Sequence, residues 1–387
     1  MADINVTIFE NSTDNGSVQD VNIFYAIFIP IFCVVTSFAN LATITAFCKV
    51  PELWERPSEV LILSLSCADF GTGLLVLPLF SPMYITPGSY PFGENICALF
   101  VFLLDVTVNA SLLSLLNISI DRFLLVYKEY PRYLKMQSRY RVNLAIIVSW
   151  SISIFTGIVE MGMWRVAKSL DYTASQIDYA AECLSPPRRM QSYSLPLFMV
   201  FYFTPALLMS CFSIAFLYFL RKRLVKSRRT DVKSSKSKLD TALQMENQLS
   251  SKSKDPEVQK EHHQSAISMS TSKPHTPSVI QTSQKRQQSD RNRYVKPAVT
   301  LMALVSAMAI CMLPYCFYVI IVECLCQKCS YEFNLLKALL FLQFCNACLD
   351  PFLYAMTQRK IREFYIKTLK RVQSCALCKE GGHYSCR

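Results

Sequence analysis

The sequence is poor in glycine and in charged residues. Only nine of its 387 residues are glycine, where an average chain of this length would carry about 27. This scarcity excludes collagen-like chains, glycine-rich disordered chains and nucleotide-binding domains built on glycine-rich loops. Charged residues make up 18% of the chain and hydrophobic residues 52%, whereas a soluble domain is about 25% charged. The composition is therefore unusual for a cytosolic protein.

Lysine and arginine are absent from the first 48 residues, although the whole chain carries a net charge of +12. Residues 221–296 contain 18 basic and 7 acidic residues, and residues 358–387 contain 8 basic and 2 acidic residues. The remainder is net −5. In membrane proteins basic segments stay on the cytoplasmic side. The charge therefore indicates orientation and contact with lipid, and it does not call for a nucleic-acid partner.

Long apolar runs separate the charged segments. A membrane-spanning helix needs about 20 mostly apolar residues, whereas a helix of a soluble protein is apolar along one face only. The sequence therefore predicts an all-α membrane protein, a bundle of seven transmembrane helices. The seven runs are residues 22–48, 58–83, 95–127, 142–164, 193–220, 297–323 and 334–357.

Seven spans place the two termini on opposite sides of the plasma membrane. The N-terminus is expected outside, because Asn5, Asn11 and Asn15 lie in Asn-x-Ser/Thr sequons that are glycosylated only in the lumen. No cleavable signal peptide is expected, since a basic first region is missing. The predicted divisions are an extracellular N-terminus (1–21), helices 1–5 (22–221), a disordered basic loop (222–293), helices 6–7 (294–357) and an amphipathic helix with the cytoplasmic tail (358–387).

The 16 cysteines divide by location. Those inside the apolar runs are expected to be buried apolar side chains. Cys97 and Cys183 lie on the outer side, where oxidising conditions would allow them to form a disulfide. Cys326 and Cys329 are the favoured pair in the last outer loop, with Cys324 left over.

Short motifs recur in a fixed order within the runs. The resemblance is to the rhodopsin-like (class A) G-protein-coupled receptors, and it covers about residues 22–372. It implies a receptor, not an enzyme, that binds an extracellular ligand and promotes nucleotide exchange on a heterotrimeric G protein. The motifs are Asn40, Leu65-Ser66-Cys67-Ala68-Asp69, Asp121-Arg122-Phe123, Trp150, Pro205, Cys311-Met312-Leu313-Pro314 and Asp350-Pro351-Phe352-Leu353-Tyr354.

Within that class, several features resemble the biogenic-amine receptors, especially the muscarinic and histamine branches. The resemblance makes Asp105 the candidate anchor for an organic ammonium group, with Asn109 one turn further along. Tyr315, Phe341 and Phe344 are candidate rings for cation–π contacts with that group. The alternatives are a peptide, lipid or other small ligand, an Asp105 that only meets water or a loop cation, and, more remotely, a membrane transporter.

The spacing of Asp105 departs from the amine-receptor pattern. Amine receptors place the anchoring aspartate eighteen residues before the arginine of the Asp-Arg pair, whereas Asp105 lies seventeen before Arg122 and Leu104 occupies the usual place. At about 100° per residue, Asp105 is expected to be rotated by that angle from the usual face.

Two further groups of polar residues follow from the resemblance. One is a polar network that could hold an allosteric sodium ion, because a hard cation prefers oxygen ligands. No other metal or cofactor is expected. The network comprises Asn40, Asp69, Ser111, Asn346 and Asp350. The other group is the switch that couples to the G protein, namely Asp121, Arg122, Pro314 and Tyr354.

The chain also departs from the class pattern at the switch. Met312 and Met308 replace the usual Trp and Phe, Ser213 replaces a Tyr, and Tyr294 stands where an acid often holds Arg122. Methionine packs without a strong rotamer preference, so raised basal activity is expected.

The tail after Tyr354 has apolar residues at helical spacing among Lys and Arg, which predicts an amphipathic helix on the inner leaflet. Cys375 and Cys378 are candidate palmitoylation sites. Arrestin and receptor kinases are further expected partners, since Ser and Thr are frequent in residues 222–293.

Overall fold

The structure is a computed structural model that describes residues 5–6, 21–85, 90–128, 130–169, 196–252, 277–322 and 333–380. Within these ranges seven helical stretches are long and apolar enough to cross a membrane, and each overlaps one of the predicted runs. The prediction of a seven-helix bundle is confirmed. The stretches are Ala26–Lys49, Pro57–Phe80, Asn95–Tyr127, Arg139–Met163, Pro196–Lys226, Ala298–Ile320 and Leu335–Thr357.

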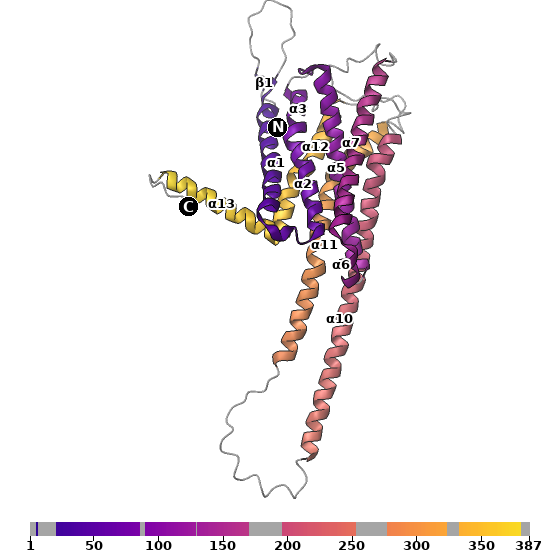
Figure 1. The fold of residues 1–387 in the computed structure, drawn as a ribbon, viewed down its shortest axis with the longest axis vertical. Helices are drawn as coiled ribbons and strands as arrows, with labels where there is room; N and C mark the ends of the chain where they lie inside the picture. Colours follow the sequence, from indigo (N-terminus) through magenta and orange to yellow (C-terminus); the bar gives the residue numbers. More distant parts are fainter. Residues whose placement is uncertain are drawn as a thin grey trace, which may run out of the picture.

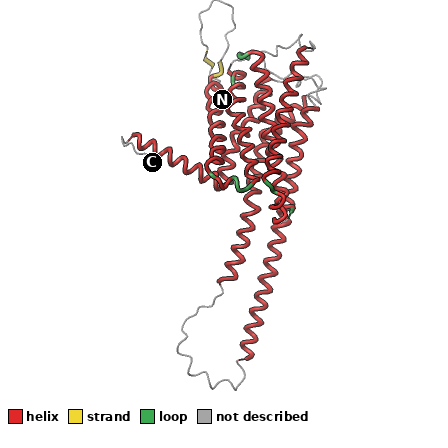
Figure 2. Tube along the Cα trace, viewed as in Figure 1, coloured by secondary structure: helices red, strands yellow, loops and turns green. Residues whose placement is uncertain are grey.

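The bundle is built almost entirely of helices (Figures 1 and 2). In chain order they are α1 (Ile23–Lys49), η1 (Pro51–Leu53), η2 (Pro57–Glu59), α2 (Val60–Gly71), η3 (Thr72–Val76), α3 (Leu77–Phe80), α4 (Pro82–Ile85), α5 (Gly93–Tyr127), α6 (Tyr130–Met136), α7 (Arg139–Ser169), η5 (Met199–Phe203), α10 (Thr204–Lys252), α11 (Pro277–Ile320), α12 (Phe333–Thr357) and α13 (Arg359–Glu380). Two short strands, β1 (Asn5–Val6) and β2 (Val21–Asn22), pair antiparallel just before α1.

Two of the spans contain a π-helical turn beside a proline. Pro78 follows η3 and Pro205 follows η5. A proline nitrogen cannot donate to the helical hydrogen-bond ladder, so the ladder is commonly irregular at such places. Tyr202 of η5 is partly buried, and its hydroxyl reaches Asp105 of α5.

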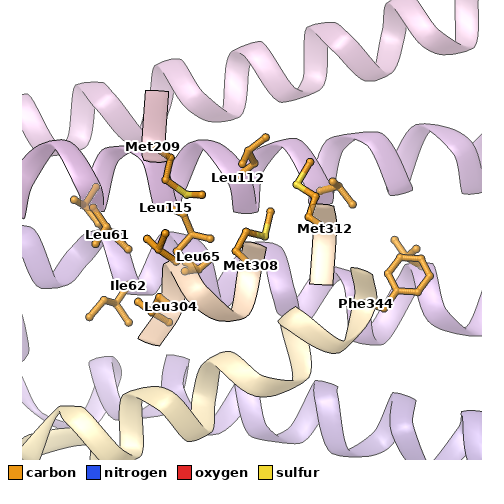
Figure 3. Packing of buried hydrophobic residues seen from close by; sticks show 14 of the residues in the cluster. Leu61, Ile62, Leu65, Leu112, Leu115, Met209, Leu304, Met308, Met312 and Phe344 are labelled. Atoms are coloured by element: carbon orange, nitrogen blue, oxygen red, sulfur yellow. The ribbon is translucent and has the colours of Figure 1, made fainter. Parts of the chain in front are cut away.

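The helix α5 is the centre of the bundle. In the apolar stretch of this span 78% is buried, whereas in the apolar stretch of α1 only 22% is buried. Figure 3 shows the packing around it, with Met209 pointing toward Leu115. Most exposed apolar residues lie on the outside of the spans, where a membrane protein meets lipid. The buried cluster in Figure 3 includes Leu61, Ile62, Leu65, Leu112, Leu115, Met209, Leu304, Met308, Met312 and Phe344.

The helices α10 and α11 continue far beyond the rest of the bundle (Figure 1). They cover residues 222–252 and 277–293, which were expected to be disordered. The expectation of disorder does not hold for these ranges. Their sequence explains the difference, because no proline or glycine interrupts residues 206–255, and Lys, Leu, Gln and Ala favour helix.

The last helix, α13, leaves the bundle at a steep angle (Figure 1). The end of the bundle where it begins is called the α13 end below. Ile361 is buried against the bundle, whereas Ile366, Leu369 and Val372 are exposed. The Tyr365 hydroxyl lies 2.6 Å from Thr43 Oγ1 of α1. The predicted amphipathic helix after the seventh span is therefore present.

Candidate functional site

Asp105 is buried in the middle of the bundle, with 4% of its surface exposed. Its Oδ1 accepts a hydrogen bond from the Tyr202 hydroxyl of η5 and another from Asn109 Nδ2 at 3.2 Å. Asn109 Nδ2 also donates to Thr156 Oγ1 of α7 at 3.3 Å. The Asp105 carboxyl is therefore held where α5, α7 and η5 meet.

The three candidate rings lie in different surroundings. Tyr315 of α11 is buried. The Phe344 ring packs edge-on against Phe80, with the ring centres 5.0 Å apart. The Phe341 ring packs against Phe28 and Phe32 of α1, with ring centres 5.8 and 5.0 Å away. Phe341 is thus a packing residue of the α1–α12 interface.

A small cavity of about 20 Å³, lined in part by Phe344, lies among α2, η3, α5, α11 and α12. Asp69, Ser111 and Asn346 line it, so the structure brings three of the predicted polar residues together. Ser111 Oγ donates to Asp69 Oδ1 at 3.2 Å, and Asn346 Nδ2 donates to Asp350 Oδ2 at 3.3 Å. The Asp350 carboxyl interacts with that of Asp69. Such a cavity has room for about one water molecule or a small ion.

Asn40 ties the first and last spans together at the same depth. Its Nδ2 donates to the carbonyl oxygens of Thr36, at 3.0 Å, and of Ala347, at 2.9 Å. Asn40 and Asp350 are both fully buried. The predicted polar network therefore joins α1, α2, α5 and α12.

The cytoplasmic switch predicted at Asp121 and Arg122 lies at the α13 end of α5. Arg122 Nη1 is 3.1 Å from Asp121 Oδ2. Asp121 Oδ1 accepts from the Tyr133 hydroxyl at 3.0 Å and from Gln137 Nε2 at 2.9 Å. Burial, and then the nearby Asp121 charge, raise the pKa of Tyr133, so its hydroxyl keeps the proton that it donates.

The remaining switch residues lie in α11 and α12. Pro314 is inside α11, where the missing N–H allows a bend. Met308 and Met312, which stand at positions where the class pattern has aromatic residues, are buried. Ser213 Oγ is 3.4 Å from Ser119 Oγ, which links α10 to α5. Tyr354 is fully buried in α12.

The comparison with protein families agrees with this arrangement. Residues 39–354 match the family described as 7 transmembrane receptor (rhodopsin family). The chain belongs to this family. It is therefore a multi-pass membrane receptor of a family whose members respond to extracellular ligands and act through G proteins.

Biogenic-amine receptors are among the proteins similar to this receptor. It is 25% identical over 349 residues to the 5-hydroxytryptamine receptor 1F of Homo sapiens, covering 87% of this chain and 89% of that one. It is 23% identical over 350 residues to the 5-hydroxytryptamine receptor 1B of Equus caballus, covering 89% and 85%. A Dopamine D2-like receptor of Drosophila melanogaster is 27% identical over 134 residues, covering 35% and 14%.

Several predicted modification sites fall outside the described side chains. Cys97 is disulfide-bonded in this receptor, but Cys183, Cys326 and Cys329 lie outside the described residues, as do Asn11 and Asn15. Asn5 belongs to β1, and Cys375 and Cys378 belong to α13. Their proposed glycosylation and palmitoylation stay predictions.

The residues that contact the predicted site residues were not found from the sequence. Tyr202 and Thr156 belong to the surroundings of Asp105, and Tyr133 and Gln137 to those of Asp121. The only sequence signal was for Tyr202, a polar residue three positions before Pro205 in an apolar run. Thr156 and Tyr133 lie on helices, and Gln137 lies between α6 and α7, so the approach of all three to α5 depends on the tertiary fold.

Proposed function

We propose that this receptor binds a small organic amine from the extracellular side and promotes nucleotide exchange on a heterotrimeric G protein. The observation that carries the proposal is the buried Asp105 carboxylate, held by Tyr202 and Asn109, in a chain similar to 5-hydroxytryptamine receptors. A buried ionisable group within a span is costly and usually serves a function. The receptor would carry out no covalent chemistry itself.

An ammonium group is a good partner for this carboxylate. Tyr202 and Asn109 both donate to Oδ1, so they orient the carboxyl group without neutralising it. A ligand ammonium would supply the opposite charge, which is strongly favoured in a buried environment. The bound amine would lie toward η5 and α7, since the carboxyl faces those elements.

The charge distribution supports the orientation of the receptor in the membrane. The basic segments 221–296 and 358–387 belong on the cytoplasmic side. The N-terminus and the Asp105 half of the bundle would then face outward, and the α13 end with Arg122 would face the G protein. Arrestin and receptor kinases would use the same cytoplasmic side, while α13 would rest on the inner leaflet.

The oxygen atoms of the polar cavity fit a sodium ion. Asp69 Oδ2 and Asn346 Oδ1 are buried and accept no hydrogen bond from the described residues. Hard cations such as sodium prefer carboxylate, amide and hydroxyl oxygens. Asp69, Ser111 and Asn346 would hold the ion, and its charge would offset that of the neighbouring carboxylates. We propose no other cofactor.

The amine proposal is tested by removing the charge of Asp105 without changing its size. Asp105→Asn should lower the potency of whichever amine activates the receptor by about 100-fold or more, because a buried charge partner is lost. The probes are 5-hydroxytryptamine, tryptamine, dopamine and histamine, and the measurement is agonist-stimulated GTPγS binding to several purified heterotrimers. Glu52→Gln, an exposed acid at the other end of the bundle, is the control.

Three outcomes would contradict the proposal. Full amine potency in the Asp105→Asn receptor would remove Asp105 as the anchor. Activation by a peptide or lipid, with no amine active on the unmodified receptor, would favour the other ligand classes. Ligand-driven flux without nucleotide exchange would indicate a transporter.

A further inference from the structure

Glu160 is the only acidic residue of α7, and it lies within the stretch Arg139–Met163 that is long and apolar enough to cross a membrane. Its side chain is partly buried. An ionisable group within a span is costly and usually serves a function. The position of Glu160 relative to Asp105 therefore decides whether it belongs to the proposed amine site.

One face of α7 is hydrogen-bonded to α5, and Glu160 lies on that face. Asn117 Nδ2 of α5 donates to Ser149 Oγ at 2.9 Å. One and two turns further along α7 come Ser153 and Thr156, and Thr156 Oγ1 accepts from α5 at 3.3 Å. At about 100° per residue, Glu160 projects within about 40° of both Ser149 and Thr156. It is therefore on the side of α7 that meets α5.

The opposite side of α7 faces away from the bundle. Phe155 and Ile158 lie there, and they are 59% and 52% exposed. In a helix each Cα–Cβ bond tilts toward the N-terminus, so the Glu160 side chain leans toward Thr156, one turn away. Both its direction around the helix and its tilt bring the Glu160 carboxyl toward the hydrogen-bonded group of Asp105.

Asp105 and Glu160 lie at the same depth of the bundle. The helices α5 and α7 run antiparallel, because the earlier of the two bonded asparagines of α5 meets the later of the two bonded hydroxyls of α7. Asp105 precedes Asn109 by four residues. Glu160 follows Thr156 by four, so both carboxyl groups lie one turn to the same side of the Asn109–Thr156 bond.

The two helices approach closely at this depth. A Cβ on Gly157 would lie 2.8 Å from Val106 Cγ2 and 2.9 Å from Phe102 Cδ2. Packed helices have axes about 8–10 Å apart, and contact through a glycine favours the shorter separation. Asp105 accepts a hydrogen bond from Asn109 at 3.2 Å, on the side of α5 that meets α7. The two carboxyl groups therefore lie within reach of the two ends of a short diamine.

No basic residue occurs in the stretches of sequence that surround this pair. Residues 95–109 of α5, residues 142–163 of α7 and residues 196–220, which contain η5, include no lysine, arginine or histidine. Two carboxylates at one depth repel each other, whereas a positive group beside each favours the charged form of both. A ligand with two positive groups complements this arrangement better than a ligand with one.

We infer that the ligand of this receptor is dibasic, a short aliphatic diamine that places one ammonium group on Asp105 and the other on Glu160. The inference rests on the proposed amine site and deepens it by naming the class of amine. Tyr202 and Asn109 orient the first carboxylate, and Glu160 is the residue that determines specificity for the second ammonium. A monoamine makes only the first of these two contacts.

The experiment compares diamines with monoamines of equal chain length on the full-length receptor. Putrescine is paired with butylamine and cadaverine with pentylamine, and the measurement is agonist-stimulated GTPγS binding. Each diamine should be about tenfold or more potent than its monoamine, because a second ion pair forms in a partly desolvated site. Thermal stabilisation of the purified receptor measures the same preference without a G protein.

Substitutions of Glu160 should remove this preference alone. Glu160→Gln should lower diamine potency about tenfold and leave monoamine potency unchanged. Glu160→Leu carries no polar group into the span and should give the same result, which covers the case in which Glu160→Gln folds poorly. Glu160→Asp withdraws the carboxylate by one methylene and should favour cadaverine over putrescine. Glu52→Gln, at an exposed acid of the other end of the bundle, should change nothing.

Asp105→Asn should weaken diamines and monoamines alike, since both use that carboxylate. A purely structural role of Glu160 would likewise lower the potency of both classes together, so a parallel loss in the Glu160 variants would overturn the inference. Equal potency of a diamine and its monoamine on the unmodified receptor would overturn it as well.

The inference and the proposed function fail in different ways. A receptor that responds to 5-hydroxytryptamine or dopamine, but to neither diamine, would overturn the inference and leave the amine proposal standing. A receptor that responds to no amine, mono- or dibasic, would overturn the proposed function and with it this inference.

Discussion

The hydroxyl of Tyr202 donates a hydrogen bond to Oδ1 of Asp105, across 97 positions of sequence. The contact joins the π-turn η5 to the middle of α5 and sets the direction of the carboxyl group. Asn109 and Thr156 extend the same hydrogen-bonded group to α7.

Removing the Tyr202 hydroxyl should weaken amine agonists. Tyr202→Phe keeps the ring stacked on Phe198, 5.8 Å away between centres, but loses the hydrogen bond that orients Asp105. A hydrogen bond to a charged group contributes about 1.5 kcal/mol or more, so agonist potency should fall about tenfold. Concentration–response curves for GTPγS binding measure it, with Tyr218→Phe, an exposed tyrosine of α10, as the control. Unchanged potency would show that Tyr202 only packs.

Sodium should lower agonist affinity through the polar cavity. A cation held by Asp69 and Asn346 would tie α2 to α12 and favour the resting arrangement. Agonist competition binding in sodium chloride should therefore be about fivefold weaker than in N-methylglucamine chloride of equal ionic strength. Asp69→Asn should abolish the difference, while Asp240→Asn on the exposed part of α10 should keep it. A persistent sodium effect in Asp69→Asn would place the ion elsewhere.

One of the few glycines should be difficult to replace, because the backbones of two helices approach each other closely at its position. A Cβ on Gly73 would lie 2.9 Å from the Ser37 backbone nitrogen of α1 and 2.8 Å from Ser37 Oγ. Backbone cannot move aside cheaply, so Gly73→Ala should destabilise the receptor by about 1–3 kcal/mol. The measurement is the Tm of the ligand-free receptor in detergent. Gly162→Ala meets nothing within 4 Å and should leave Tm unchanged or slightly raised; equal losses for both would contradict the argument.

The contact between Tyr365 and Thr43 should help to dock α13 on α1. Tyr365→Phe and Thr43→Val should each cost about 1 kcal/mol, and the double variant should cost little more than either alone. Burial raises the pKa of Tyr365, whose ordinary value is about 10. The neutral phenol, and with it the contact, should therefore persist throughout the neutral range and be lost only at strongly alkaline pH. Additive losses measured by Tm would show that the two residues act independently.

Much of the fold could be predicted because the signal that decides it lies in consecutive residues of the chain. A run of about 20 apolar residues specifies a membrane helix regardless of its neighbours, and all seven runs became spans. Asp69, Ser111 and Asn346 were also predicted to gather, and they line one cavity. Residues 222–252 were expected to be disordered but are helical, because no proline or glycine interrupts them.

The surroundings of each site residue could not be predicted in the same way. Phe341 was expected near an ammonium group, yet its ring packs on Phe28 and Phe32 of α1. Thr156 carried no signal at all, because it matters only through its contact with Asn109, and those two residues are 47 positions apart. Such proximity follows from how two helices cross, which apolar runs do not specify.

The sequence by itself therefore determined the number of spans, the orientation expected from charge, the family motifs and the types of residue at each site. These depend on local composition and on spacing along the chain, which set how each segment partitions into the membrane. Only the tertiary structure decided that Asp105 lies against Tyr202 and that Asn109 lies against Thr156. The physical reason is that the rotation and crossing of each helix are set by side-chain packing among all seven, so a single residue's neighbours emerge only once the whole bundle is assembled.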